Sequence, residues 1–155
     1  MPAHNATKDA HKDAHADNVN DADARYAYEY AIVRVVPRVE RGEYVNVGVV
    51  LLCRQRRYLG GRIAFGARQQ AGLRALAPDL DLAEVEQHLE SIPLICRGGA
   101  AGGPIGLLSQ AERFHWLVAP ASTIIQPSPV HTGLCSDPAA SLDHLMNMLV
   151  HDDAQ

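Results

Sequence analysis

Three consecutive stretches in the N-terminal half of the chain are rich in β-branched and aromatic residues, a composition typical of strands. They cover residues 28–36, 44–53 and 58–65. Only short polar links join them, one around Gly42 and one over Arg54 to Arg57. Links this short cannot make the crossover that parallel neighbours need, so we expect an antiparallel meander. The Gly60-Gly61 pair predicts a β-bulge in the third strand.

Helical signals follow the meander. Residues 67–77 have a helix-forming composition. Asp81 and Glu84 form a capping box that opens a second helix, which we expect Pro93 to limit. Near the C-terminus, Asp137 followed by Pro138 is a strong helix start, and the residues after it give the last helix an apolar face.

The region between these helices is expected to be mixed. A Gly-rich loop is predicted over 97–106, and Ser109 with Glu112 predicts a short helical turn through Arg113. Strands are expected at 114–118 and 123–126, followed by an irregular stretch over 127–133. The order of elements favours an α+β fold: an antiparallel meander with helices packed on one face, further short strands and a C-terminal amphipathic helix.

The ends of the chain differ in composition from its middle. Residues 1–24 consist mainly of Ala, Asp, Asn, His and Lys, which predicts a disordered tail before a single domain at 25–151 and a frayed end at 152–155. Within the tail, His11 and His15 are four positions apart, a spacing that could grip a metal ion on a transient helix, although a solvated tail is the alternative. The N-terminus lacks a secretory pattern and no apolar run reaches about 18 residues, so a cytoplasmic location is expected.

Cysteine usage and charge exclude some classes of protein. Cys53, Cys96 and Cys135 are widely spaced and odd in number, which predicts buried free thiols and argues against a disulfide framework or a zinc ribbon. The formal net charge of −4 disfavours general nucleic-acid binding, which needs clustered positive charge. We predict no cofactor, because no phosphate loop or paired-carboxylate signature is present. Whether the protein is an enzyme stays open.

Two motifs carry a family resemblance. The first runs from Tyr28-Glu29-Tyr30-Ala31-Ile32-Val33-Arg34-Val35-Val36-Pro37 to Gly42-Glu43-Tyr44-Val45-Asn46-Val47-Gly48-Val49, and the second from Arg113-Phe114-His115-Trp116 to Gln126-Pro127-Ser128-Pro129-Val130-His131-Thr132-Gly133-Leu134. Together they resemble an uncharacterised bacterial family catalogued as domain of unknown function 3037, over about residues 26–150. The resemblance implies a possible protein partner, a HipA-like kinase encoded by a neighbouring gene. Where the family usually carries Arg, this chain has Ala121, so an anion contact made by that Arg would be missing.

The first hairpin holds one candidate site. Alternation places Val45, Val47, Val49, Leu51 and Cys53 on one face of the second strand. If Val36 lies opposite Tyr44, Arg34 lies opposite Asn46, and Ile32 lies opposite Gly48, where the missing side chain would leave open space. This arrangement could form a floor for an anionic ligand. The alternative is a structural ion pair between Arg34 and a carboxylate, for which Glu112 is a candidate.

The second motif holds the other candidates. It gathers polar side chains that could bind a ligand: Arg113, His115, Ser122, Thr123 and His131. His131 could act as an acid or base near neutral pH, and Cys135 four positions later makes a Cys–His nucleophile pair conceivable.

Three functions fit these features. The leading interpretation is a non-catalytic partner or regulatory protein, with a HipA-like kinase as the partner that the resemblance implies. The second is a small enzyme or binder of a phosphorylated or nucleotide-like anion that uses Arg34, Arg113 and His131. The third is a nucleic-acid-associated module using the basic turn from Arg54 to Arg57. No membrane contact is expected, and the oligomeric state stays open.

Overall fold

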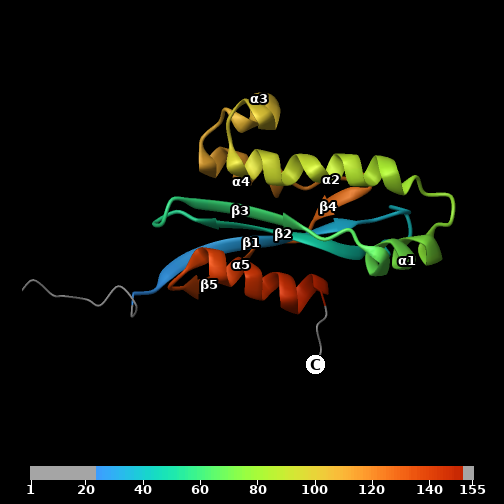
Figure 1. Ribbon diagram of the computed structural model, residues 1–155, viewed down its shortest axis with the longest axis horizontal. Coiled ribbons are helices and arrows are strands. Elements are labelled where there is room, and N and C mark those ends of the chain that lie inside the picture. The colour runs from blue at the N-terminus through green and yellow to red at the C-terminus, as the bar shows by residue number, and fades with distance from the viewer. Residues whose placement is uncertain (1–23, 152–155) are drawn as a thin grey trace, which may run out of the picture.

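The computed structural model describes residues 24–151, and it has an α+β fold with helices on both sides of one antiparallel sheet (Figure 1). The predicted tail up to residue 23, its His11 and His15 pair, and the predicted frayed end at 152–155 lie outside the described residues. Within the described part, no helix combines the length and apolar character needed to cross a membrane.

The sheet contains five strands in an order that places the N-terminal strand in the middle. The strands are β1 (Tyr26–Val35), β2 (Val45–Cys53), β3 (Tyr58–Ile63), β4 (Ile125–Pro127) and β5 (His131–Cys135). The order is β3-β2-β1-β4, and β5 also pairs with β1. Because β2 occupies one edge of β1, β4 and β5 share the other edge, β4 beside residues 33–35 and β5 beside residues 26–30. The predicted antiparallel meander is confirmed.

A bulge in β2 changes which side chains share a face. The β1–β2 register shifts between the pairs Val33–Gly48 and Arg34–Asn46, which leaves Val47 as the extra residue. Val47 therefore joins one core cluster, whereas Val49, Leu51 and Cys53 join the other. The prediction of one shared face from Val45 to Cys53 was wrong, because strict alternation holds only without such an insertion.

The predicted bulge at Gly60-Gly61 was also wrong, since the β2–β3 register runs without interruption through both glycines. Close packing explains the glycines instead. A Cβ added at Gly61 would lie 2.6 Å from the Sγ of Cys96, and one added at Gly60 would meet the ring of Tyr58. All three cysteines are free and buried, as predicted.

Helices cover the two faces of the sheet with two separate core clusters. The helices are α1 (Ala67–Leu76), α2 (Leu82–Arg97), α4 (Gln110–Leu117) and α5 (Pro138–Met146). Figure 1 shows α2 and α4 on one side of the sheet and α5 on the other. We call these the α2 face and the α5 face. Phe114, Leu89 and Ile92 pack on the α2 face, and Leu142, Leu145 and Met146 pack on the α5 face.

Local signals fix most helix starts. The Asp81 carboxylate accepts a hydrogen bond from the Glu84 amide, and the Asp137 carboxylate accepts from the amides of Ala139 and Ala140. However, α2 does not end at Pro93. It continues to Arg97 because Ile95 and Cys96 bury their side chains, and it stops at Gly98, whose φ of 77° needs glycine. One lost backbone hydrogen bond at Pro93 is tolerated.

Two other predictions for the C-terminal half were wrong. Residues 114–118, predicted as a strand, belong mainly to α4, because the capping box of Ser109 and Glu112 opens a helix that buries Arg113 and Phe114. Residues 131–133, predicted as irregular, lie in β5, where pairing with β1 overrides the proline-rich context. The predicted loop over 97–106 contains two short turns, η1 (Ala100–Gly102) and α3 (Gly103–Gly106), and the chain ends its described part in η2 (Asn147–His151).

Candidate functional site

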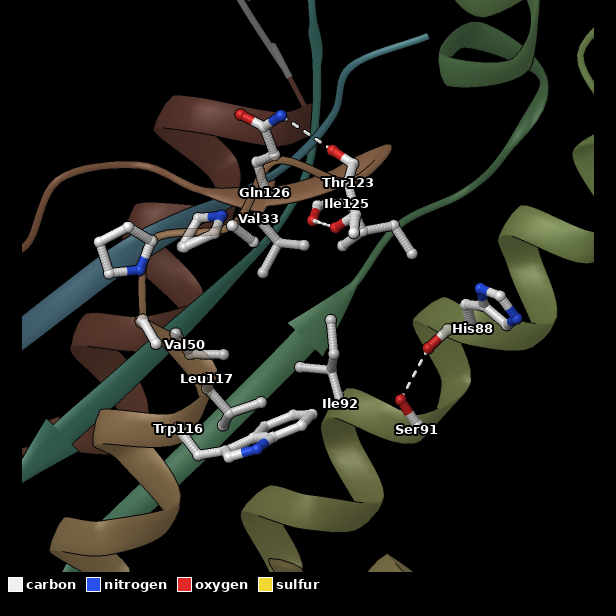
Figure 2. Close-up of a pocket in the computed structure, with 14 residues that line it drawn as sticks. Val33, Val50, His88, Ser91, Ile92, Trp116, Leu117, Thr123, Ile125 and Gln126 are labelled. Carbon is white, nitrogen blue, oxygen red and sulfur yellow. Dashed lines mark hydrogen bonds between the residues drawn. The ribbon is translucent and has the colours of Figure 1, made fainter. Parts of the chain in front are cut away.

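A groove opens on the α2 face between α2, the end of α4 and the segment 119–127 (Figure 2). It encloses about 410 Å³, and a second cavity of about 490 Å³ shares His88, Thr123 and Ile125 with it. The two cavities are therefore neighbours along α2, from Leu80 before the helix to Trp116 on α4, and we call them together the groove.

The floor and walls of the groove are mainly apolar. Val33 and Val50 of the sheet line it, and Figure 2 shows Trp116 and Leu117 of α4 facing Ile92 of α2. The side chain of Trp116 remains 53% exposed. A half-exposed Trp at the mouth of an apolar groove is typical of a surface that binds another molecule.

The hydroxyl groups in the groove already have partners. The Thr123 hydroxyl donates to the Ile125 carbonyl at 2.9 Å, and the Ser91 hydroxyl donates to the His88 carbonyl at 2.7 Å. The Gln126 side chain turns away from the groove in Figure 2 and donates to the Thr123 carbonyl. The exposed His88 imidazole is the polar side chain that remains free for a ligand among these four.

The charged side chains that line the groove are all acidic and lie at one end of it. Asp81 and Glu84 lie at the end near the start of α2. No Lys or Arg is among the residues that line either cavity. The groove therefore suits a neutral or cationic ligand better than an anionic one.

Arg34 and Asn46 lie side by side, as predicted from the first hairpin. Both are on the α5 face, because Val33 and Val35 of the same strand belong to the opposite cluster. The Arg34 guanidinium lies over the Tyr44 ring, 4.1 Å from its centroid. Asn46 donates to the Leu149 carbonyl at 3.2 Å.

Two polar atoms of this pair are unmatched. The Arg34 Nε and the Asn46 Oδ1 are buried and have no hydrogen-bond partner. The alternative of an ion pair with Glu112 was wrong, because that carboxylate accepts from the Ser109 amide in the capping box of α4. The expected open space at Gly48 was wrong too. Gly48 lies opposite Val33, and a Cβ there would meet the backbone oxygen of Arg62.

The guanidinium of Arg113 donates hydrogen bonds to backbone carbonyls and so has a structural role. Its side chain is buried, and Nη1 donates to the carbonyls of Ile95 and Cys96, both at 2.8 Å. Its Nε donates to the Leu108 carbonyl at 3.1 Å. The two Nη1 bonds supply donors to carbonyls in the last turn of α2, where few backbone donors remain. Arg113 thus lies on the α2 face, away from Arg34.

The remaining predicted residues do not converge on Arg34. His131 stands opposite Tyr30, four positions and about 13 Å along β1 from Arg34. Its ring centroid lies 5.3 Å from that of Tyr30. His115 is exposed, with its Nε2 3.4 Å from Arg54. Ser122 is exposed, and Thr123 lines the groove.

His131 and Cys135 are not brought together. Both lie on β5, four positions apart, which separates them by about 13 Å. Cys135 is buried, and desolvation together with neighbouring Cys53 raises the pKa of its thiol. Among residues 24–151, no group of three or more His, Cys, Asp or Glu side chains is placed to hold a metal ion.

The basic turn between β2 and β3 has partners within the chain. Arg54 lies 3.9 Å from the Glu29 carboxylate as well as near His115, and Arg56 lies over the Tyr26 ring at 5.1 Å. Two of the turn's three arginines, Arg54 and Arg56, therefore contact neighbouring side chains.

Sequence reasoning missed the groove and its main residues, Trp116 and His88. Assigning residues 114–118 to a strand hid the position of Trp116 on the last turn of a helix. A helix extended from the capping box at Ser109 would have placed it correctly. The contact between α2 and the segment 119–127 had no local signal.

The fold and groove together define a small α+β protein with an open apolar groove beside one face of its sheet. Residues 30–150 match the model of a family described as a protein of unknown function, DUF3037. The chain belongs to this family, as the two motifs indicated. No curated protein and no solved structure matches the chain. Ala121, where the resemblance expects Arg, is exposed and lines the groove.

Proposed function

We propose that this protein is a non-catalytic binding or regulatory protein that docks a segment of a partner protein in the groove of the α2 face. The observation that carries the proposal is the exposed Trp116 in a mainly apolar groove made of two neighbouring cavities. Binding sites on proteins concentrate their energy in such desolvated aromatic anchors.

The chemistry of the groove defines the partner segment. Because the Ser91 and Thr123 hydroxyls are satisfied internally, recognition relies on burial of apolar surface rather than on a polar network. Asp81 and Glu84 at one end favour a Lys or Arg on the partner. The occupant is therefore an apolar peptide segment that carries a basic residue at the end near the start of α2.

The HipA-like kinase implied by the family resemblance is the first partner to test. Trp116 is the single Trp of the chain, so its fluorescence reports directly on the groove. Trp-free peptides tiled along the kinase sequence are titrated into the protein. The expected result is a saturable blue shift for one segment with an apolar stretch and a flanking Lys or Arg.

Two variants locate the binding site. Ala119→Arg places a large cation in the groove, where the native side chain is exposed, and is expected to weaken binding of the cationic segment by about tenfold or more. Leu107→Ala is the matched control, because Leu107 is 72% exposed but does not line the groove. Equal weakening by both variants, or no shift with any peptide, would remove the support for docking here.

A second candidate function is binding of a phosphorylated or nucleotide-like anion at Arg34. The observation that favours it is a half-buried guanidinium, stacked on Tyr44, that has no carboxylate partner within the described residues. Arg113 already donates to three carbonyls, which leaves Arg34 as the main cation for such a ligand.

Thermal shift with phosphate and with nucleotides tests this candidate. A ligand that binds only the folded state raises the melting temperature. The increase is expected to disappear in Arg34→Ala and to persist in Arg74→Ala, which removes an exposed arginine of α1. If no anion changes the melting temperature, binding at Arg34 is rejected. This outcome does not bear on the proposal for the groove.

A further inference from the structure

The open edges of the sheet differ in how they are protected. An exposed strand edge presents unpaired N–H and C=O groups and can pair with another chain, so most edges carry a protecting feature. At β4, Pro127 has no N–H to offer, and the side chains of Thr123 and Gln126 donate to the carbonyls of Ile125 and Thr123. The β4 edge is therefore blocked by its own sequence.

The β3 edge is protected by other means. α2 packs on one face of β3 and α5 packs on the other. Arg62, an exposed residue of this strand, forms an ion pair with Asp143 of α5. Charged side chains and flanking helices both discourage a second strand from pairing there.

The β5 edge has neither kind of protection. β5 pairs with β1 on one side, and no other described strand pairs with it. Its five residues, His131 to Cys135, contain no proline and no Lys, Arg, Asp or Glu. In an antiparallel strand, alternate residues direct their N–H and C=O groups to the unpaired side. Within residues 24–151, β5 therefore offers free hydrogen-bonding groups, and the strand itself carries no charge that would repel a neighbour.

Exposed and half-buried side chains beside this edge add apolar surface on both faces. Leu134 is 68% exposed and lies next to exposed Ala27 on the α2 face. On the α5 face, the rings of Tyr28, Tyr30 and His131 form a cluster with centroid separations of 6.0 and 5.3 Å. A strand added to β5 would contact Leu134 on one face and this cluster on the other.

We propose that two copies of this chain pair antiparallel through β5 and form one continuous sheet across a two-fold axis. Full overlap of the five residues centres the pairing on Gly133, which places Leu134 of each copy opposite Thr132 of the other. This register buries the exposed Leu134 and sets no like charges against each other. A two-fold arrangement uses the same edge on both copies, so neither is left with an open β5 edge.

The test is the molar mass of the full chain in solution, measured by light scattering and by sedimentation over a range of concentrations. The native protein is expected to approach twice the chain mass of 16.8 kDa as concentration rises. Leu134→Lys introduces a charge at the β5 edge, and charged residues commonly protect edge strands from pairing. This variant is expected to raise the dimer dissociation constant at least about tenfold. Leu107→Lys removes an equally exposed leucine elsewhere and is expected to leave the dimer intact.

Hydrogen exchange gives a second readout that does not depend on a variant. Amides of residues 131–135 that face the open edge are expected to become protected as concentration rises, whereas amides of the β4 edge are expected to stay unchanged. A native chain that stays monomeric at the highest soluble concentration overturns the proposal. So does a dimer that Leu107→Lys disrupts as strongly as Leu134→Lys. Neither result bears on the groove, because Trp116 is not part of β5.

Discussion

The two faces of the sheet are packed to different degrees. On the α5 face, Leu142, Leu145 and Met146 are all buried. On the α2 face, Leu89 and Phe114 are equally buried, but Trp116 and Ile124 beside them remain exposed along the groove. The core residues of α5 are thus fully covered, whereas the α2 face keeps exposed apolar side chains beside its core, along the groove.

The two faces also differ in how well the hydrogen-bond donors of a buried or half-buried arginine are matched. Arg113 on the α2 face is buried with its donors matched to three carbonyls. Arg34 on the α5 face stacks on Tyr44 while its Nε lacks a hydrogen-bond partner. The cation on the α5 face therefore has a buried donor without a partner, whereas no buried donor of Arg113 is left without one. Packing density and polar matching vary independently in this molecule.

Replacement of a core leucine tests the difference in packing most strongly. Leu142→Ala removes a side chain that is 1% exposed and is expected to lower the free energy of unfolding by about 2–5 kcal/mol. Trp116→Ala removes a larger but half-exposed side chain and is expected to cost less than Leu142→Ala. Urea denaturation of both variants measures the two costs. Equal losses would mean that Trp116 belongs to the core and that the groove is not a free surface.

Replacement of each arginine by methionine tests the difference in polar matching. Arg113→Met removes three hydrogen bonds to backbone carbonyls and is expected to lower the free energy of unfolding by about 2–4 kcal/mol. Arg34→Met removes no hydrogen bond and buries no new polar group, so its expected cost is below about 1 kcal/mol. The same denaturation measurement compares them. A larger loss of stability for Arg34→Met than for Arg113→Met would mean that Arg34, and not Arg113, is the arginine that stabilises the fold.

The free energy of unfolding at alkaline pH tests whether water reaches the core beneath α2. Burial raises the pKa of the Cys96 thiol to about 12 from an ordinary value of 9.0. Between these values the unfolded chain loses the thiol proton while the folded chain keeps it, so the free energy of unfolding falls as pH rises. The expected slope is at most about 1.4 kcal/mol per pH unit from this thiol.

Cys96→Ala serves as the control for that slope. It is expected to lower stability at neutral pH but to flatten the decline between pH 9.0 and about 12. Burial also raises the pKa of Cys135 on the α5 face, so part of the decline is expected to remain. A slope unchanged by Cys96→Ala would show that water reaches this thiol through the open face.

Local signals explain which parts of the fold could be predicted. The three strands of the meander and the helices that begin after Asp81 and Asp137 each depend on residues within a few positions, and all were placed within about three residues at their starts. The bulge at Val47 has no such local mark, because the inserted residue is an ordinary valine whose position depends on pairing with β1.

Long-range contacts explain what was missed in the candidate site. The juxtaposition of Arg34 and Asn46 follows from one hairpin and could be predicted, whereas the groove joins residues of the sheet, α2, α4 and the segment 119–127. Residues in the second motif that looked ready to bind a ligand are partly structural. Arg113 is one such residue. Another polar residue of the motif, Ser128, accepts from the Ile32 amide at 2.8 Å and ties the link between β4 and β5 to β1. A sequence cannot distinguish these uses of a polar side chain without knowing its neighbours.

β1, at the centre of the sheet, is made before the other described strands. It gains its last neighbours only after β4 and β5 have been made. Ile32 and Ser128, which share a hydrogen bond, are 96 positions apart in the chain. At about 5–20 residues per second, translation of the chain between them takes roughly 5–20 seconds. Throughout that interval β1 has β2 on one side and no native partner on the other. The nascent meander is then open to chaperones and to neighbouring nascent chains, so slow codons between α1 and β4 are expected to lower the yield of folded protein.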